Sequence, residues 1–127
     1  MLLKFVPAHR KAFRMAGWLC VGLLVWLSWI PRDWEVRTTL PGQFEHALAY
    51  CGTAGLFALG DPRLTWWRPL APLVALAACL EVGQIWIPGR TAQVVDFAAS
   101  SLGALIGAVI GGLLGAAFAG WRARAER

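Results

Sequence analysis

Long apolar runs separated by short charged connections dominate this sequence and limit the folds open to it. Four such runs cover about residues 13–30, 44–60, 69–87 and 94–118. A helix needs about 20 apolar residues to cross the hydrocarbon core of a bilayer, with a usual range of about 17–25. Only 15% of the 127 residues are charged and 58% are hydrophobic, unlike a water-soluble domain of this size. We therefore expect an all-α fold, a single polytopic membrane domain built as a four-helix transmembrane bundle.

The composition also narrows the class of partner. The net charge is +5, but the basic residues are dispersed among the ends and connections, which does not suggest a nucleic-acid partner. Cys20, Cys51 and Cys79 fall in three different apolar runs, without the spacing of a metal site or disulfide. The first run lacks a small-x-small cleavage site and is expected to stay as a helix. The bilayer is the expected partner, and we expect neither metal nor cofactor.

The distribution of Lys and Arg predicts the orientation. Nine of these residues fall at the two termini and in the turn over 61–68, against three in the loop over 31–43 and at Arg90. The positive-inside rule then places both termini in the cytoplasm, here of a bacterial inner membrane. Tryptophans fall near both expected interfaces: Trp26, Trp29, Trp34 and Trp86 near the outer one, and Trp18, Trp66, Trp67 and Trp121 near the inner one.

Polar residues in the apolar runs concentrate toward the expected outer side. A charge near the centre of a membrane helix costs about 2.5–3.5 kcal/mol on insertion scales, so such residues are candidates for function. The candidate binding residues are His46 and Tyr50 in the second run, Glu81 and Gln84 in the third, Arg90 in the following turn, and Asp96 and Ser100 in the fourth. Their common side predicts one site that opens outward.

Glycine recurs at every fourth position of the fourth run: Gly103, Gly107, Gly111 and Gly115. A ladder of small residues lets two helix backbones approach closely in lipid, where packing drives helix association. We expect this ladder to pack against another helix of the same chain; dimerisation is the weaker interpretation.

These residues together resemble the signature of the VanZ-like family, which comprises small bacterial membrane proteins of typically four to five helices. The match consists of Glu81-x-x-Gln84, then Pro88-Gly89-Arg90, then Asp96 with Gly103 and Gly107, preceded by His46-x-x-x-Tyr50, within about residues 42–111. Gly42-Gln43 stands where the family usually has Asp-Lys, and Ser100 where it has Asn. The founding member is associated with low-level teicoplanin resistance, so the resemblance implies a role in the cell envelope.

Structural interpretations stand beside the functional ones. Glu81 and Arg90 are candidates for an ion pair between the third helix and the outer loop, and Asp96 for the cap of the fourth helix. Gln84 would then bond a backbone carbonyl, while His46 and Glu45 would be solvated. We also expect Glu81, Arg90 and Asp96 to form one cluster, with His46 and Tyr50 on its rim.

Two functions from different classes remain. In the first, the outer site binds an anionic or peptidic headgroup of the envelope, and Arg90 pairs with its phosphate or carboxylate. In the second, the chain is an intramembrane enzyme acting on a lipid-linked envelope precursor, with Glu81 or Asp96 as general base and His46 as proton shuttle. The sequence contains neither a G-x-S-x-G motif nor a metal-ligand set, which favours the first.

Overall fold

The computed structural model describes residues 5–36, 38–61 and 65–127, and every regular element in this part is a helix. Helix α1 covers Phe5–Trp29, α2 Gly42–Gly60, α3 Leu70–Gly83 and α4 Val94–Ala125. Two short 3-10 turns, η2 (Arg32–Trp34) and η3 (Gln84–Trp86), lie in the connections. The all-α prediction is confirmed. Lys4, Arg37 and Arg63, which entered the charge count, lie outside the described residues.

The first and last helices are longer than predicted. Helix α1 begins at Phe5 rather than near residue 13, because the basic stretch contains no helix breaker after Pro7. A proline in the first turn is tolerated, since its missing N–H would have no partner within the helix. Helix α4 continues to Ala125 rather than ending near residue 118, and Arg122 and Arg124 lie in its last turn. Cations there interact favourably with the helix dipole.

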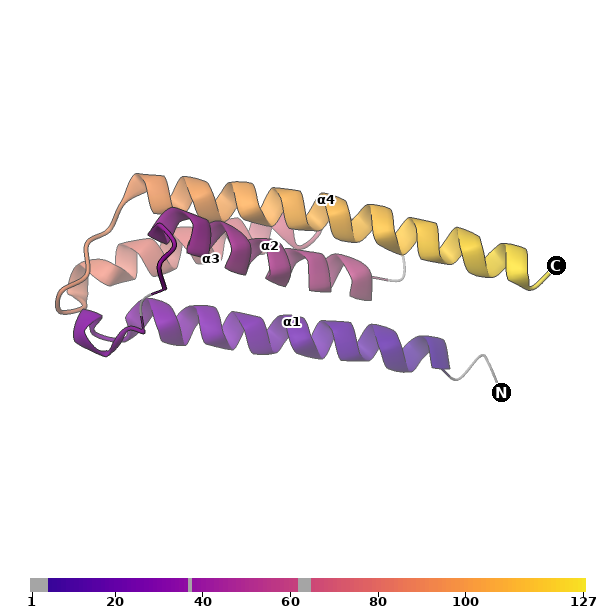
Figure 1. Cartoon of the computed structure of the whole chain (residues 1–127), viewed down its shortest axis with the longest axis horizontal. Helices are drawn as coiled ribbons and strands as arrows, with labels where there is room; N and C mark the ends of the chain where they lie inside the picture. The colour runs from indigo at the N-terminus through magenta and orange to yellow at the C-terminus, as the bar shows by residue number, and fades with distance from the viewer. Residues whose placement is uncertain (1–4, 37, 62–64) are drawn as a thin grey trace.

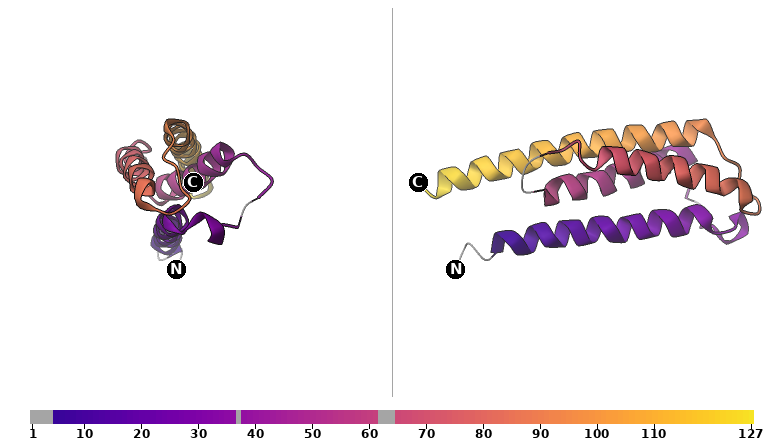
Figure 2. Two further views of the ribbon diagram at one scale, coloured as in Figure 1. Left: turned by 90° about the vertical axis from the view of Figure 1, so that its left-hand side faces the viewer. Right: turned by 180° about the vertical axis from the view of Figure 1, so that it is seen from behind.

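The four helices run side by side along the long axis of the molecule (Figure 1). Helix α1 contacts α2 and α3, and α4 contacts the same two helices from the opposite side, as the end-on view of Figure 2 shows. The connections after α1 and after α3 lie at one end of the bundle, which we call the loop end. Both chain ends lie at the other end, and α4 extends beyond its neighbours there (Figure 1).

Two helices are long and apolar enough to cross a membrane, namely His9–Trp29 within α1 and Val94–Ala125. The apolar stretch Leu70–Trp86 is shorter. Large hydrophobic side chains cover the outside of the bundle, including Leu19 and Leu23 on α1 and Leu113 on α4. All eight tryptophans are exposed as well. The outer surface of the described chain is thus largely apolar.

The seam between α2 and α4 is built from small residues, as the glycine ladder predicts. A Cβ at Gly103 would overlap the backbone of Ala47, and one at Gly107 would overlap the carbonyl oxygen of Cys51. A Cβ at Gly111 would lie 2.6 Å from the carbonyl oxygen of Gly55. The partner positions rise in step along both helices, so α2 and α4 run parallel. The prediction that the ladder packs within the chain is confirmed for these three glycines, and Gly115 is only half-buried.

The core follows from this close approach. Ala54 of α2 and Ala104 and Ala108 of α4 are fully buried, and Tyr50, Leu73 and Leu80 pack in the same cluster. Alanine and glycine along the seam bring the two backbones together, and the larger side chains of α3 fill the space beside them. The seam fixes the first turns of α2 and α4 next to each other at the loop end.

Candidate functional site

A polar pocket of about 350 Å³ lies at the loop end of the bundle. It is enclosed by the segment after α1, the start of α2, η3, the connection after η3 and the start of α4. Its charged and amide-bearing lining residues are Arg32, Glu35, Glu45, His46, Gln84, Arg90, Gln93 and Asp96; Thr38 and Thr91 add hydroxyl groups. Four of the predicted site residues, His46, Gln84, Arg90 and Asp96, therefore share one pocket.

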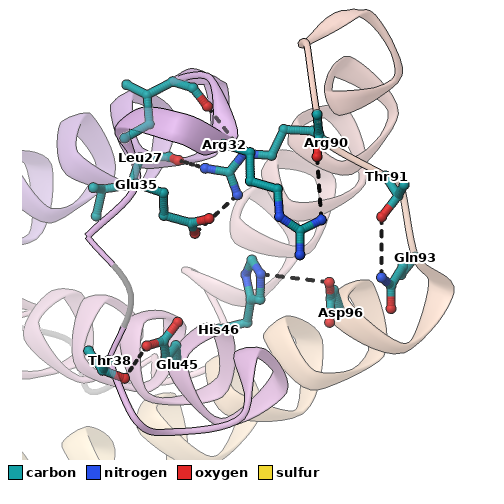
Figure 3. A network of polar contacts seen from close by, with 12 residues as sticks. Leu27, Arg32, Glu35, Thr38, Glu45, His46, Arg90, Thr91, Gln93 and Asp96 are labelled. Atoms are coloured by element: carbon teal, nitrogen blue, oxygen red, sulfur yellow. Dashed lines mark hydrogen bonds and ion pairs between the residues drawn. The ribbon is translucent and has the colours of Figure 1, made fainter.

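Arg90 joins the connection after η3 to the end of α1. Its Nη2 donates to the carbonyl oxygen of Leu27 at 2.6 Å, its Nε to that of Ile30 at 3.2 Å, and its Nη1 to Glu35 Oε1 at 3.2 Å. The last carbonyls of a helix have no partner within it, and the planar guanidinium supplies several donors at once. These bonds tie the connection after η3 to the end of α1 and to Glu35 in the loop that follows, so Arg90 acts as a clamp (Figure 3).

The expected ion pair of Arg90 with Glu81 or Asp96 is therefore wrong. Among the described residues, Glu35 is the carboxylate that pairs with Arg90. The expectation failed because the charged residues of the loop over 31–43 were used only to predict the orientation and were not considered as partners of Arg90. In the structure this loop folds back over the site and presents Glu35 to the guanidinium.

Arg32 takes the place in the pocket that was expected for Arg90. Figure 3 shows its side chain directed toward His46 and Asp96, whereas the guanidinium of Arg90 points away from them. Its Nη1 makes one long hydrogen bond, 3.4 Å, to the carbonyl oxygen of Gly89. No carboxylate of the described residues forms an ion pair with it. Within the described part of the chain, Arg32 is thus the lining arginine without a carboxylate partner, and we call it the uncommitted cation.

His46 and Asp96 face each other across the first turns of α2 and α4. His46 Nε2 lies 3.8 Å from Asp96 Oδ2, and their side chains are 27% and 14% exposed. The other carboxylate oxygen, Asp96 Oδ1, is buried and has no hydrogen-bond partner among the described residues. The interpretation of His46 as a solvated, isolated side chain is therefore wrong.

Asp96 does not cap α4, contrary to expectation. Gln93 is the N-cap residue, and the backbone N–H of Gln93 donates to Glu81 Oε1 from the end of α3. Glu81 thus satisfies a donor of the next helix, as a capping side chain would. An acidic residue in the first turn still interacts favourably with the helix dipole, and Asp96 holds that position.

Glu81, Tyr50 and Ser100 lie outside the pocket lining. Tyr50 and Ser100 are each 3% exposed, and Tyr50 is near enough to Glu81 to interact with it electrostatically. The predicted cluster is thus divided in two. His46, Arg90 and Asp96 line the pocket, while Glu81 and Tyr50 lie outside its lining.

The loop over 31–43 and Glu45 contribute to the pocket although neither was among the predicted site residues. Thr38 Oγ1 donates a hydrogen bond to Glu45 Oε1, and both residues line the pocket. Glu45 lies in the first turn of α2 as expected, and its exposed hydrogen bond to Thr38 is an additional contact. The available signal was a polar loop carrying charges of both signs directly before the histidine-bearing helix.

The described residues contain no group of three or more His, Cys, Asp and Glu side chains able to hold a metal ion. Comparisons of the chain with family models, with curated proteins and with solved structures find no match.

Proposed function

We propose that this chain is a VanZ-like integral membrane protein of the bacterial inner membrane, whose polar pocket binds an anionic or peptidic headgroup of the cell envelope at the outer face. In this proposal all four helices cross the bilayer and both termini are cytoplasmic. The loop end then faces outward, so the pocket is open to the envelope space.

The exposed surface supports the membrane location. Water-soluble monomers rarely expose contiguous apolar patches larger than a few hundred Å². Here Leu102, Leu105, Ile106, Val109 and Ile110 are all exposed along one helix. The distribution of Lys and Arg supports the orientation, because the loop end carries three of the twelve.

The uncommitted guanidinium of Arg32 is the observation that carries the ligand class. Guanidinium groups recognise carboxylates and phosphates through paired N–H donors. Arg32 points into a pocket that also offers carboxylate, amide and hydroxyl groups. Such a lining suits a headgroup with an anionic end and neighbouring amide or ammonium donors, which is the pattern of a short peptide.

Calorimetric titration of the detergent-solubilised full chain tests this proposal, with N-acetyl-dialanine and inorganic phosphate as separate probes. We expect saturable binding of at least one probe and about tenfold weaker binding after Arg32→Gln, the size of a lost charge-assisted hydrogen bond. Arg124→Gln removes the same charge from the far end of α4 and should leave binding unchanged. No binding of either probe, or equal loss in the two variants, would contradict the proposal.

The pair of His46 and Asp96 supports a second function, an intramembrane enzyme acting on a lipid-linked envelope precursor. A carboxylate beside an imidazole can hold the ring in one orientation, which suits general acid–base catalysis. For the enzyme we expect His46→Gln to retain probe binding while abolishing glycopeptide or envelope-stress resistance at unchanged protein level. For the binding protein, the resistance should follow probe affinity across the Arg32 and His46 variants.

A further inference from the structure

A second cavity lies toward the opposite end of the bundle, between α1, the end of α2 and the start of α3. Its volume is about 690 Å³, within the range of about 300–1,000 Å³ that is usual for ligand sites. We call it the lateral groove. It shares no lining residue with the polar pocket.

The lateral groove is charged at one end and apolar along its length. The charged end lies near the end of α2 and just before the start of α3, and its residues are Arg14, Asp61 and Arg68. The apolar lining comes from Trp18 and Val21 on α1, Phe57 on α2, and Leu73 and Leu76 on α3. Val21 lies about two helical turns beyond Arg14, and Leu76 lies about as far beyond Arg68, both toward the middle of the bundle. The groove thus changes from polar to apolar along the bundle axis.

The charges of the groove favour an anion. Within the described part of the chain, neither Arg14 nor Arg68 makes an ion pair. The single carboxylate in the lining, Asp61, accepts a hydrogen bond from Thr65 Oγ1. The described lining thus carries two arginines and one carboxylate, a formal net charge of +1.

The apolar part has a defined wall. Trp18 and Phe57 stack edge to face with ring centroids 5.5 Å apart, which holds both rings in place. Leu73 beside them is 3% exposed and belongs to the core. The Trp18 ring remains 65% exposed, so its free face is available to an occupant.

We propose that the lateral groove holds one anionic phospholipid of the cytoplasmic leaflet. Its phosphate lies between Arg14 and Arg68, and one acyl chain lies along Trp18, Phe57 and Leu76. The assignment to the cytoplasmic leaflet depends on the proposed orientation of the chain. The assignment of an anionic lipid depends only on the residues that line the groove. Failure of the probe-binding test at the polar pocket would leave this proposal standing.

Native mass spectrometry of the full chain in mixed micelles tests it, with phosphatidylglycerol and phosphatidylcholine carrying the same acyl chains. We expect one phosphatidylglycerol to be retained in preference to phosphatidylcholine, and about tenfold less of it in the double variant Arg14→Gln/Arg68→Gln. The matched control Arg122→Gln/Arg124→Gln removes the same charge from the exposed end of α4 and should retain the lipid. Equal retention of both lipids, or equal loss in both double variants, would overturn the proposal.

Tryptophan fluorescence of the wild-type chain tests the proposal even if the variant Arg14→Gln/Arg68→Gln does not fold. Lipids brominated on the acyl chain quench nearby tryptophan fluorescence, and the difference between wild type and Trp18→Phe isolates Trp18. We expect brominated phosphatidylglycerol to quench this component at a lower mole fraction than brominated phosphatidylcholine. Leu76→Trp, which fills the groove but keeps both arginines, should lower phosphatidylglycerol retention. Equal quenching by the two lipids, or full retention in Leu76→Trp, would contradict the placement.

Discussion

Gly107 of α4 lies so close to Cys51 of α2 that a Cβ at position 107 would overlap the Cys51 carbonyl oxygen. The obstacle is backbone, which cannot rotate away as a side chain can. This contact sets the separation of two parallel helices, and their first turns hold His46 and Asp96 on facing sides of the polar pocket. The ladder therefore connects packing in the bundle with geometry at the loop end.

Gly107→Ala should separate α2 from α4 and lower the free energy of unfolding by about 1–3 kcal/mol, the usual cost of overpacking. Gly107→Leu should prevent assembly. Gly22→Ala is the matched control, because a Cβ at Gly22 meets nothing within 4 Å. Thermal unfolding in detergent and size-exclusion profiles would measure both effects. Equal stability of Gly107→Ala and Gly22→Ala, or normal assembly of Gly107→Leu beside the exposed change Leu113→Ile, would refute the close approach.

The clamp formed by Arg90 predicts a loss of stability when its partner is removed. Arg90 donates to the carbonyl oxygens of Leu27 in α1 and of Ile30 just after it, pairs with Glu35, and has a side chain that is 11% exposed. Hydrogen bonds to charged groups contribute about 1.5–3 kcal/mol each, and neighbouring residues show non-additive effects. We expect a double-mutant cycle of Arg90→Gln and Glu35→Gln to give a favourable coupling energy of about 1 kcal/mol. Additive effects of the two changes would mean that the pair is absent in solution.

Glu81 should act on the start of α4 rather than on a ligand. Its carboxylate accepts the Gln93 backbone N–H, so Glu81→Ala should cost about 0.5–2 kcal/mol, as the loss of a capping residue does. Glu81→Gln keeps an acceptor oxygen and should retain most of the stability. Hydrogen exchange at residues 93–97 should accelerate in the alanine variant only. Unchanged exchange in Glu81→Ala would show that this bond does not hold the helix start.

The helical fold was largely predictable because apolar runs of about 20 residues are compatible with few structures other than long helices. Apolar runs gave the four helices, and the periodic glycines gave the seam on α4. The identity of the partner helix needed three-dimensional information, since Ala47, Cys51 and Gly55 carry no strong signal by themselves. The parallel direction of α2 and α4 was already implied by four helices that alternate in direction. The helix ends differed because Lys and Arg residues beyond the apolar runs still favour helix.

The sequence predicted which residues lie near one another at the candidate site better than it predicted their hydrogen-bond and ion-pair partners. His46, Gln84 and Asp96 were placed correctly at one pocket, because helical spacing and the expected depth fix where they lie. The partners of Arg90 were not predictable, because they depend on the path of an irregular loop. Arg32 was missed for the same reason, although it is the cation that faces the pocket.

Cysteine labelling in intact cells tests most directly the proposal that the polar pocket faces outward. Thr91→Cys reports on the loop end and Trp67→Cys on the connection between α2 and α3, in a background where Cys20, Cys51 and Cys79 are replaced by alanine. Both positions are exposed, and neither residue forms an ion pair. We expect a membrane-impermeant maleimide to label Thr91→Cys in intact cells and Trp67→Cys only after permeabilisation. Labelling of Trp67→Cys in intact cells, with or without labelling at Thr91→Cys, would contradict the proposed orientation.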